Sequence, residues 1–108
     1  MLWHPGLEKR WPDMPVFQQI LMICNELNRA ENLRRDPAEY KNALERALEL
    51  MDFSVDDMRM RSRLREFLRA RELVAALYAG QPVQSSLATI QRGLVQLSAE
   101  AWRVVGGG

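Results

Sequence analysis

Cysteine and histidine are nearly absent from this sequence, since its 108 residues contain one of each. A single cysteine excludes an internal disulfide and fits a reducing cytoplasm, so we expect a cytoplasmic protein. One cysteine and one histidine are also too few for an ordinary transition-metal site, which uses three or four such ligands. We therefore expect neither a disulfide nor a bound metal.

The sequence also lacks an excess of one charge and any long hydrophobic run. Fifteen basic and fourteen acidic residues give a net charge of +1, so bulk electrostatics attract neither nucleic acid nor anionic lipid. No run approaches the roughly 18–20 apolar residues of a membrane span. The segment 1–11 lacks the apolar stretch of a signal peptide. We expect no membrane contact and no nucleic-acid partner.

Residues that favour β-strands are scarce as well. The chain has 3 Ile, 7 Val and 1 Thr, against 15 Leu, 13 Arg, 11 Ala and 9 Glu, which are good helix formers. This balance predicts an all-α fold. The length corresponds to one domain, so we expect a single helical domain over 1–108.

Apolar spacing and capping signals divide the chain into an irregular N-terminal arm over 1–12 and four helices. The helices are expected at about 14–32, 37–51, 55–79 and 82–105. Asp36 and Pro37 open the second helix as N-cap and first residue, and Gly80 with Pro82 ends the third. Four helices with short links predict a small helical bundle.

The helix expected over 82–105 has the most regular apolar pattern in the chain. A seam steps alternately by four and three residues, through Val83, Leu87, Ile90, Leu94, Leu97, Ala101 and Val104. Such a period keeps a seam facing another helix. Either this helix packs into its own bundle, or the seam with Trp102 is a self-association surface of a homodimer. Ala88, Val95 and Trp102, spaced seven apart, add a second apolar edge that the bundle need not use.

Four residues are candidates for contact with a different protein: Trp3, Trp11, Phe67 and Arg71. The two arm tryptophans either fold back over the bundle or reach a second chain, because tryptophan is enriched at interface hot spots. Phe67 lies on the apolar face of the helix over 55–79, with Arg71 in the same helical phase. Arg71 either extends to solvent or pairs with a carboxylate at an interface.

Six arginines fall within thirteen residues, from Arg59 to Arg71. At 100° per residue they spread around the helix axis, which favours a solvated face over a surface that follows phosphates. The helices expected at 37–51 and 55–79, joined by three residues, also suggest a helix-turn-helix. A DNA-binding regulator is therefore kept as an alternative.

No combination of residues predicts catalysis. His4 lies in the arm, and Cys24 lies on an apolar helix face with no nearby basic residue to activate its thiol. No glycine-rich phosphate loop is present in the sequence. We expect no enzyme activity, no catalytic residue and no cofactor.

The arm carries the segments Leu2-Trp3-His4-Pro5-Gly6 and Trp11-Pro12-Asp13-Met14-Pro15. With its length and expected helix number, the chain resembles small helical quorum-sensing antiactivators of proteobacteria. Members of that group bind a LuxR-type acyl-homoserine-lactone receptor and disrupt its dimer, so that it no longer activates transcription. The resemblance implies a homodimer that binds a transcription regulator. A secretion chaperone or an assembly subunit is the alternative among binding proteins.

Overall fold

A computed structural model describes residues 3–106, and every regular element in that range is helical. Residues 1–2 of the expected arm lie outside it. The α-helices are α1 (Leu7–Arg10), α2 (Val16–Asn32), α3 (Pro37–Val55), α4 (Leu64–Tyr78), α5 (Leu87–Val95) and α6 (Ala99–Val104). Two 3₁₀ turns, η1 (Trp11–Asp13) and η2 (Met58–Arg63), precede α2 and α4. The expected all-α class is confirmed, with six α-helices in the described range instead of four.

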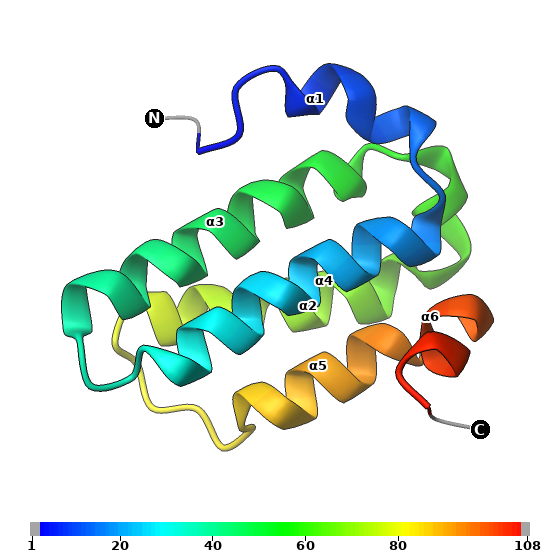
Figure 1. The fold of residues 1–108 in the computed structure, drawn as a ribbon. Helices are drawn as coiled ribbons and strands as arrows, with labels where there is room; N and C mark the ends of the chain where they lie inside the picture. The colour runs from blue at the N-terminus through cyan, green and yellow to red at the C-terminus, as the bar shows by residue number, and fades with distance from the viewer. Residues whose placement is uncertain (1–2, 107–108) are drawn as a thin grey trace.

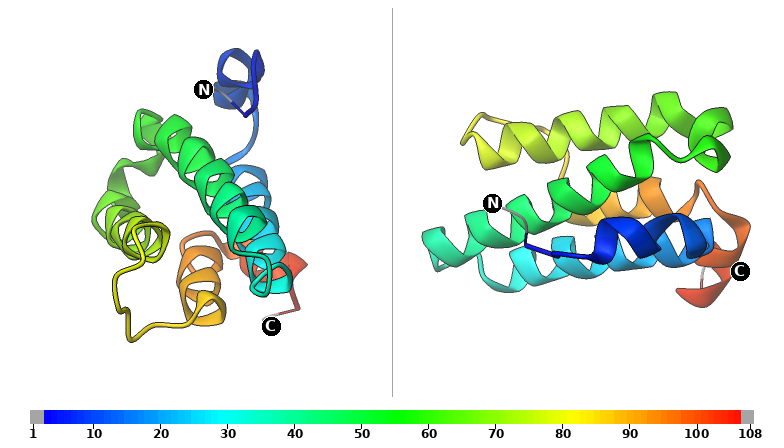
Figure 2. Two further views of the ribbon diagram at one scale, coloured as in Figure 1. Left: turned by 90° about the vertical axis from the view of Figure 1, so that its left-hand side faces the viewer. Right: turned by 90° about the horizontal axis from the view of Figure 1, so that it is seen from above.

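The four long helices close a ring. In chain order α2 packs on α3, α3 on α4 and α4 on α5, and α5 returns to contact α2 (Figure 1). Figure 2 shows this arrangement nearly end-on in its left-hand view. The segment that contains α1 lies over α3 (Figure 1). The short helix α6 contacts α2. No helix in the described part of the chain is both long and apolar enough to cross a membrane.

The core fills the space between these four helices. Each contributes fully buried side chains, among them Ile20 and Leu27 of α2, Leu44 of α3, Phe67 of α4 and Leu94 of α5. Burying one such side chain contributes about 1.5–3 kcal/mol relative to leaving it in water. The apolar stripes expected for the first three helices therefore point inward and hold the bundle together.

Two helix ends lie where the sequence predicted them, at Asp36 and at Gly80. The Asp36 side chain accepts a hydrogen bond from the Glu39 backbone N–H at 3.2 Å, which caps α3. Gly80 takes φ +76°, and the Gln81 N–H donates to the Ala76 carbonyl at 2.9 Å, closing the end of α4. Only glycine adopts this left-handed backbone without strain, so the sequence signal was specific.

The junction between the second and third helices lies later than expected. The second helix was predicted to stop at 51, but α3 continues to Val55 and the following turn is 3₁₀ until Arg63. The physical reason is Ser54, whose hydroxyl is buried beneath the arm instead of capping the next helix. Asp57 takes the capping role, accepting from the Arg59 N–H at 2.9 Å.

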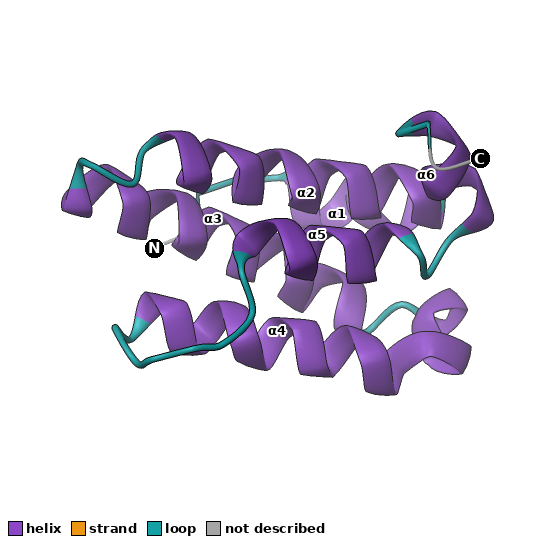
Figure 3. Cartoon of the chain, turned by 90° about the horizontal axis from the view of Figure 1, so that it is seen from below, coloured by secondary structure: helices purple, strands orange, loops and turns teal. Residues whose placement is uncertain are grey.

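The prediction of one continuous helix over 82–105 is wrong. The segment 82–86 is not helical, and the chain breaks again between α5 and α6. Two serines act as N-caps: Ser86 accepts from the Thr89 N–H at 3.1 Å and Ser98 from the Ala101 N–H at 3.2 Å. Each hydroxyl satisfies a backbone donor that a continuous helix would pair internally. The seam is therefore interrupted, and α6 turns away from the axis of α5 (Figure 3).

The N-terminal segment is more ordered than expected. The arm predicted as irregular contains α1 and the 3₁₀ turn η1, and α2 begins at Val16 instead of 14. Pro15 occupies the N-cap position of α2, and its carbonyl accepts from the Gln18 and Gln19 N–H groups at 3.0 and 3.1 Å. Asp13, which directly precedes the helix start expected at 14, lies within η1. The arm thus enters the bundle through a fixed turn.

Candidate functional site

The residues expected to bind a partner lie in different environments. Trp11 and Phe67 are fully buried, so neither side chain reaches a surface that a partner could contact. Trp3 is half-buried against α3, where the guanidinium carbon of Arg46 lies 4.9 Å from the centre of its ring. Both arm tryptophans therefore fold back over the bundle, which is the first of the two alternatives stated for them.

Arg71 forms a two-point ion pair with Asp52. Its Nε lies 2.6 Å from one carboxylate oxygen and a terminal guanidinium nitrogen lies 3.3 Å from the other. Asp52 belongs to α3, so the pair joins α3 to α4 within one chain. The carboxylate that pairs with Arg71 thus belongs to the same chain. Exposed pairs of this kind contribute about 0.2–1 kcal/mol.

A buried polar network anchors the arm. The Trp11 indole N–H donates to the Ser54 hydroxyl at 2.8 Å, and that hydroxyl donates to the Gln19 side-chain carbonyl at 2.9 Å. The Gln19 amide returns a hydrogen bond to the Trp11 backbone carbonyl at 2.9 Å. All three side chains are buried, and each of these polar groups is paired, which removes the cost of burying it.

An ion pair closes the outer edge of this network. The Arg59 guanidinium contacts Asp57 at 2.7 Å and donates to the backbone carbonyls of Pro12 and Met14 at 2.9 and 2.8 Å. Hydrogen bonds from Arg59, together with one from the Gln19 amide, hold the pKa of the Asp57 carboxyl well below its usual range. The arm is therefore attached to the α3–α4 junction by charge as well as by burial.

We expect Asp57→Asn to lower the free energy of unfolding by about 1–2 kcal/mol at pH 7. Hydrogen bonds to charged groups contribute about 1.5–3 kcal/mol, and solvent screens this one because the Arg59 side chain is 44% exposed. The lowered pKa means that the carboxylate stabilises the fold above its ordinary pKa and loses this effect as acid protonates it. Urea unfolding from pH 7 to 2 should show a wild-type decline below about pH 4 that is shallower in Asp57→Asn.

The exposed neighbour Asp56 supplies the matched control. Asp56→Asn makes the same chemical change and should shift stability by no more than about 0.5 kcal/mol. Equal losses for the two variants would show that the Asp57–Arg59 pair does not anchor the arm.

The residues of the expected self-association seam divide between core and surface. Leu87, Ile90, Leu94 and Ala101 are buried in the core, as the alternative of packing into the bundle predicts. The remaining members are less covered: Val83, Leu97 and Trp102 are half-buried and Val104 is exposed. A second copy could contact only this latter group without opening the fold.

The helices α2, α5 and α6 contact one another, and Figure 3 shows how their backbones are arranged. Residues of these helices and Val105 line a groove. We call it the C-terminal groove; it has a volume of about 290 Å³ and is lined by Cys24, Ala88, Gln91, Arg92, Val95, Trp102 and Val105. Val105 is 54% exposed, and its neighbour Val104 is 62% exposed. Exposed apolar side chains on a soluble protein carry meaning when they gather in one place. This groove is the candidate functional site.

The sequence pointed to part of the groove through the second apolar edge. Ala88, Val95 and Trp102 all line it, although the helix that was expected to align them is broken. Cys24 and Arg92 were not predicted as members. Cys24 belongs to a different helix, and Arg92 looks like any exposed helical arginine until the fold brings it beside Trp102.

Cys24 lies near the floor of the groove and is 8% exposed. Burial raises the pKa of its thiol to about 12. Its sulfur lies 3.9 Å from the Gln91 carbonyl, a contact in which the thiol is a weak donor. At neutral pH the group is therefore a neutral thiol that packs as a small apolar side chain, and the thiolate that a nucleophile needs is suppressed.

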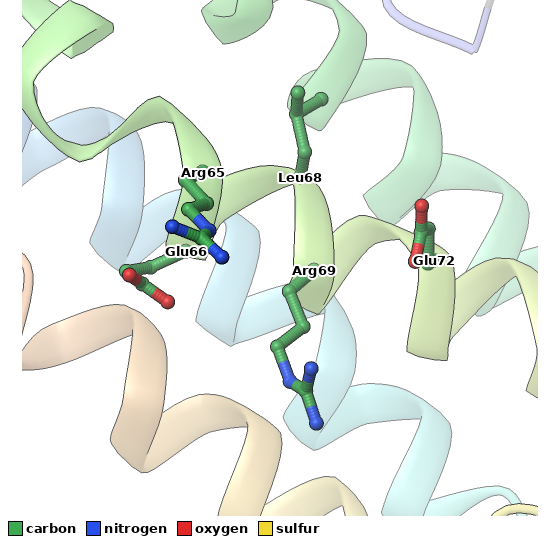
Figure 4. Close-up of a pocket in the computed structure, with 5 residues that line it drawn as sticks. All are labelled: Arg65, Glu66, Leu68, Arg69 and Glu72. Carbon is green, nitrogen blue, oxygen red and sulfur yellow. The ribbon is translucent and has the colours of Figure 1, made fainter.

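A second hollow follows the outer side of α4. Figure 4 shows its lining residues, Arg65, Glu66, Leu68, Arg69 and Glu72, projecting from one helix in different directions. Two arginines balance two glutamates, and no polar groups converge on a common point. Convergence is what a ligand site requires, so this surface is a mixed-charge helix face.

The arginine-rich segment is also partly engaged within the chain. Arg59 binds the arm and Arg71 binds Asp52, so two of the six arginines are held by intramolecular contacts. The segment is not one long helix, because its first part is the 3₁₀ turn η2. The continuous recognition helix considered in the helix-turn-helix alternative is thus shorter than the sequence suggested.

Neither a metal site among the described residues nor a similar protein points to a function. Between residues 3 and 106, no group of three or more His, Cys, Asp and Glu side chains is placed to hold a metal ion. Comparisons with protein-family models, with curated proteins and with solved structures found no match. A function for this chain therefore has to be inferred from its own residues and geometry.

Proposed function

We propose that this chain is a non-enzymatic, cytoplasmic regulatory protein that binds another protein through the C-terminal groove. The observation that carries the proposal is an accessible apolar surface at one place: Trp102 and Val105 line the groove, Val105 is 54% exposed, and its chain neighbour Val104 is 62% exposed. Tryptophan beside aliphatic side chains is the composition typical of an interface centre.

The proposed mechanism is antiactivation by sequestration. The partner is a transcription regulator of the quorum-sensing type, and binding covers a surface that this regulator needs for its own dimerisation and DNA binding. A standard interface removes about 800 Å² from each partner. The chain has 6751 Å² of accessible surface, so the groove and its surroundings would supply about an eighth of it. The Trp-Pro segments of the arm support this proposal through the family resemblance.

The resemblance also makes a homodimer part of the proposal. The side chains available for it are the accessible members of the seam that do not line the groove, Val83, Leu97 and Val104. Light scattering of the purified chain measures this directly.

The decisive experiment captures the partner and follows its activity. The full chain, tagged and added to nuclease-treated lysate of the native host, is expected to recover one transcription regulator in near-equal amount by mass spectrometry. Expressing the chain should then lower transcription from promoters that the regulator activates. Val105→Asp places a carboxylate in the groove and should weaken recovery by about tenfold, because it removes an apolar contact and adds a charged group that binding must desolvate.

Met58→Asp is the matched control. Met58 is an apolar side chain, 75% exposed in η2, which does not line the groove, so this change should leave recovery unaltered. Recovery of secretion or envelope components would favour the chaperone or assembly-subunit alternative. Specific binding of duplex DNA at physiological salt, with no protein recovered, would overturn the proposal in favour of a DNA-binding regulator.

A further inference from the structure

The C-terminal groove combines an apolar surface with one charged side chain. Five of its seven lining side chains are apolar or nearly so, and Gln91 and Arg92 are the polar members. No carboxylate is among the described residues that line it. A partner that covers this surface must therefore bring its own negative charge if Arg92 is to be paired.

The dimensions of the groove fit the side chains of a helix. Ala88, Arg92 and Val95 follow one another along α5 at positions i, i+4 and i+7, a length of about 10 Å or two helical turns. The volume of about 290 Å³ is at the lower end of the roughly 300–1,000 Å³ of small-molecule sites. A shallow stripe of this length accepts a few side chains from an adjacent helix, whose own period matches it.

The charge of Arg92 is not used inside the chain. In the described range it forms no ion pair, whereas Arg46 pairs with Glu26 at 3.1 Å and Arg71 with Asp52. Each of these two ion pairs joins two helices of the bundle. Arg92 instead lies at the edge of an apolar groove, where a partner's carboxylate would be partly removed from water.

The nearest acidic residue in sequence is already engaged in a local contact. The Glu100 carboxylate accepts a hydrogen bond from the Ser98 hydroxyl at 3.2 Å, at the start of α6. It therefore belongs to the N-terminal turn of α6. The edge of the groove at Arg92 has no competing anion from this source.

We infer that the C-terminal groove binds an amphipathic helix of the partner protein, with apolar side chains at i, i+3 or i+4 and i+7 in the groove and a Glu or Asp beside Arg92. This inference rests on the proposed function and specifies the segment that is recognised. A second copy of the chain placed groove to groove would bring its Arg92 towards the first Arg92, and like charges at an interface are unfavourable.

A peptide selection tests the inference without knowledge of the natural partner. A display library of helical peptides, about 14 residues or four turns long, is selected against the full chain. We expect enriched peptides to carry apolar residues at i, i+3 or i+4 and i+7 and an acidic residue at one fixed position. Selection against Arg92→Glu should replace that acidic residue by Lys or Arg. An enriched peptide should bind Arg92→Glu about five- to tenfold more weakly than wild type.

Arg65→Glu supplies the matched control for charge. Arg65 lies on α4 outside the groove, so reversing its charge should leave the selected motif and the affinity unchanged. Equal effects of the two reversals would show a general charge effect and overturn the inference. Enrichment without a charge preference, or no enrichment, would overturn it as well.

Alkylation of a thiol introduced at the groove locates the bound peptide. Val105 lines the groove and is 54% exposed, whereas the native thiol of Cys24 is buried. A peptide in the groove should slow the modification of the thiol introduced by Val105→Cys with iodoacetamide, as measured by mass spectrometry. Binding that leaves the rate unchanged would place the peptide elsewhere and overturn the inference.

Different results would contradict the proposed function and the inference of an acidic amphipathic helix. If the captured regulator binds wild type and Arg92→Glu equally, the acidic-helix inference fails while protein binding stands. If no protein is captured, the proposed function fails whatever peptides are selected. A dimer of this chain that Val105→Asp converts to a folded monomer would identify a second copy as the occupant and overturn the inference.

Discussion

Replacing Trp11 with alanine is expected to lower the free energy of unfolding by about 3–5 kcal/mol, the usual cost of truncating a buried aromatic side chain. The ring is fully buried and packs edge-on against Phe53, with 5.8 Å between ring centres. Alanine would leave a cavity there and remove the indole donor of the Ser54 hydroxyl. Urea unfolding followed by far-ultraviolet circular dichroism measures the loss.

Trp3→Ala is the matched control, because it removes the same side chain from the same arm. Trp3 is half-buried, and its indole N–H has no hydrogen-bond partner among the described residues. Removing its contact with Arg46 and its half-buried ring should cost about 1–2 kcal/mol, less than the loss at the fully buried Trp11. Equal losses at the two positions would mean that Trp11 has no special role in docking the arm.

Leu94→Glu is expected to unfold the chain. Leu94 is fully buried on α5, and removing it alone should cost about 2–5 kcal/mol. An unpaired carboxylate in its place adds a further desolvation penalty, against a total stability of about 5–15 kcal/mol for a typical domain. Circular dichroism at 25 °C should show the helical signal lost, and light scattering should show no well-defined folded monomer.

Val104→Glu makes a similar change at the exposed end of the same expected seam. With 62% of Val104 exposed, stability should change by no more than about 0.5 kcal/mol. A helical, folded Leu94→Glu protein would contradict the placement of Leu94 in the core. A wild-type dimer that Val104→Glu alone converts into folded monomers would locate self-association at this end of the chain.

The helix boundaries that could be predicted are those fixed by local chemistry. Asp36 caps α3 and Gly80 ends α4 because each effect depends on a few adjacent residues and one backbone conformation. The all-α class followed from composition in the same way. Such features do not depend on which helices become neighbours.

The features that could not be predicted depend on distant residues. Ser54 lies in the three-residue link expected between the second and third helices, but it is buried in α3 because Trp11 and Gln19 form hydrogen bonds with it from other elements. Ser98 lies within a continuous apolar pattern, and periodicity alone does not distinguish one long helix from two that meet at a buried serine.

The candidate site was predictable only in part for the same reason. Ala88, Val95 and Trp102 were visible as an edge spaced by seven residues, but Cys24 comes from α2, sixty-four positions before Ala88. Trp11 and Phe67 were expected at a partner surface because large aromatic residues are common there. The same residues are equally suited to a core, and the bundle buries both.

The anchoring of the arm imposes an order on folding during synthesis. Trp11 is made early, yet the serine that accepts its indole hydrogen bond follows 43 residues later. At roughly 5–20 residues per second, the ribosome needs about 2–9 s to supply that serine. During this interval the indole has no native site, because the pocket is built by α2 and α3. The segment that precedes α2 is thus synthesised before the residues that fix its native position.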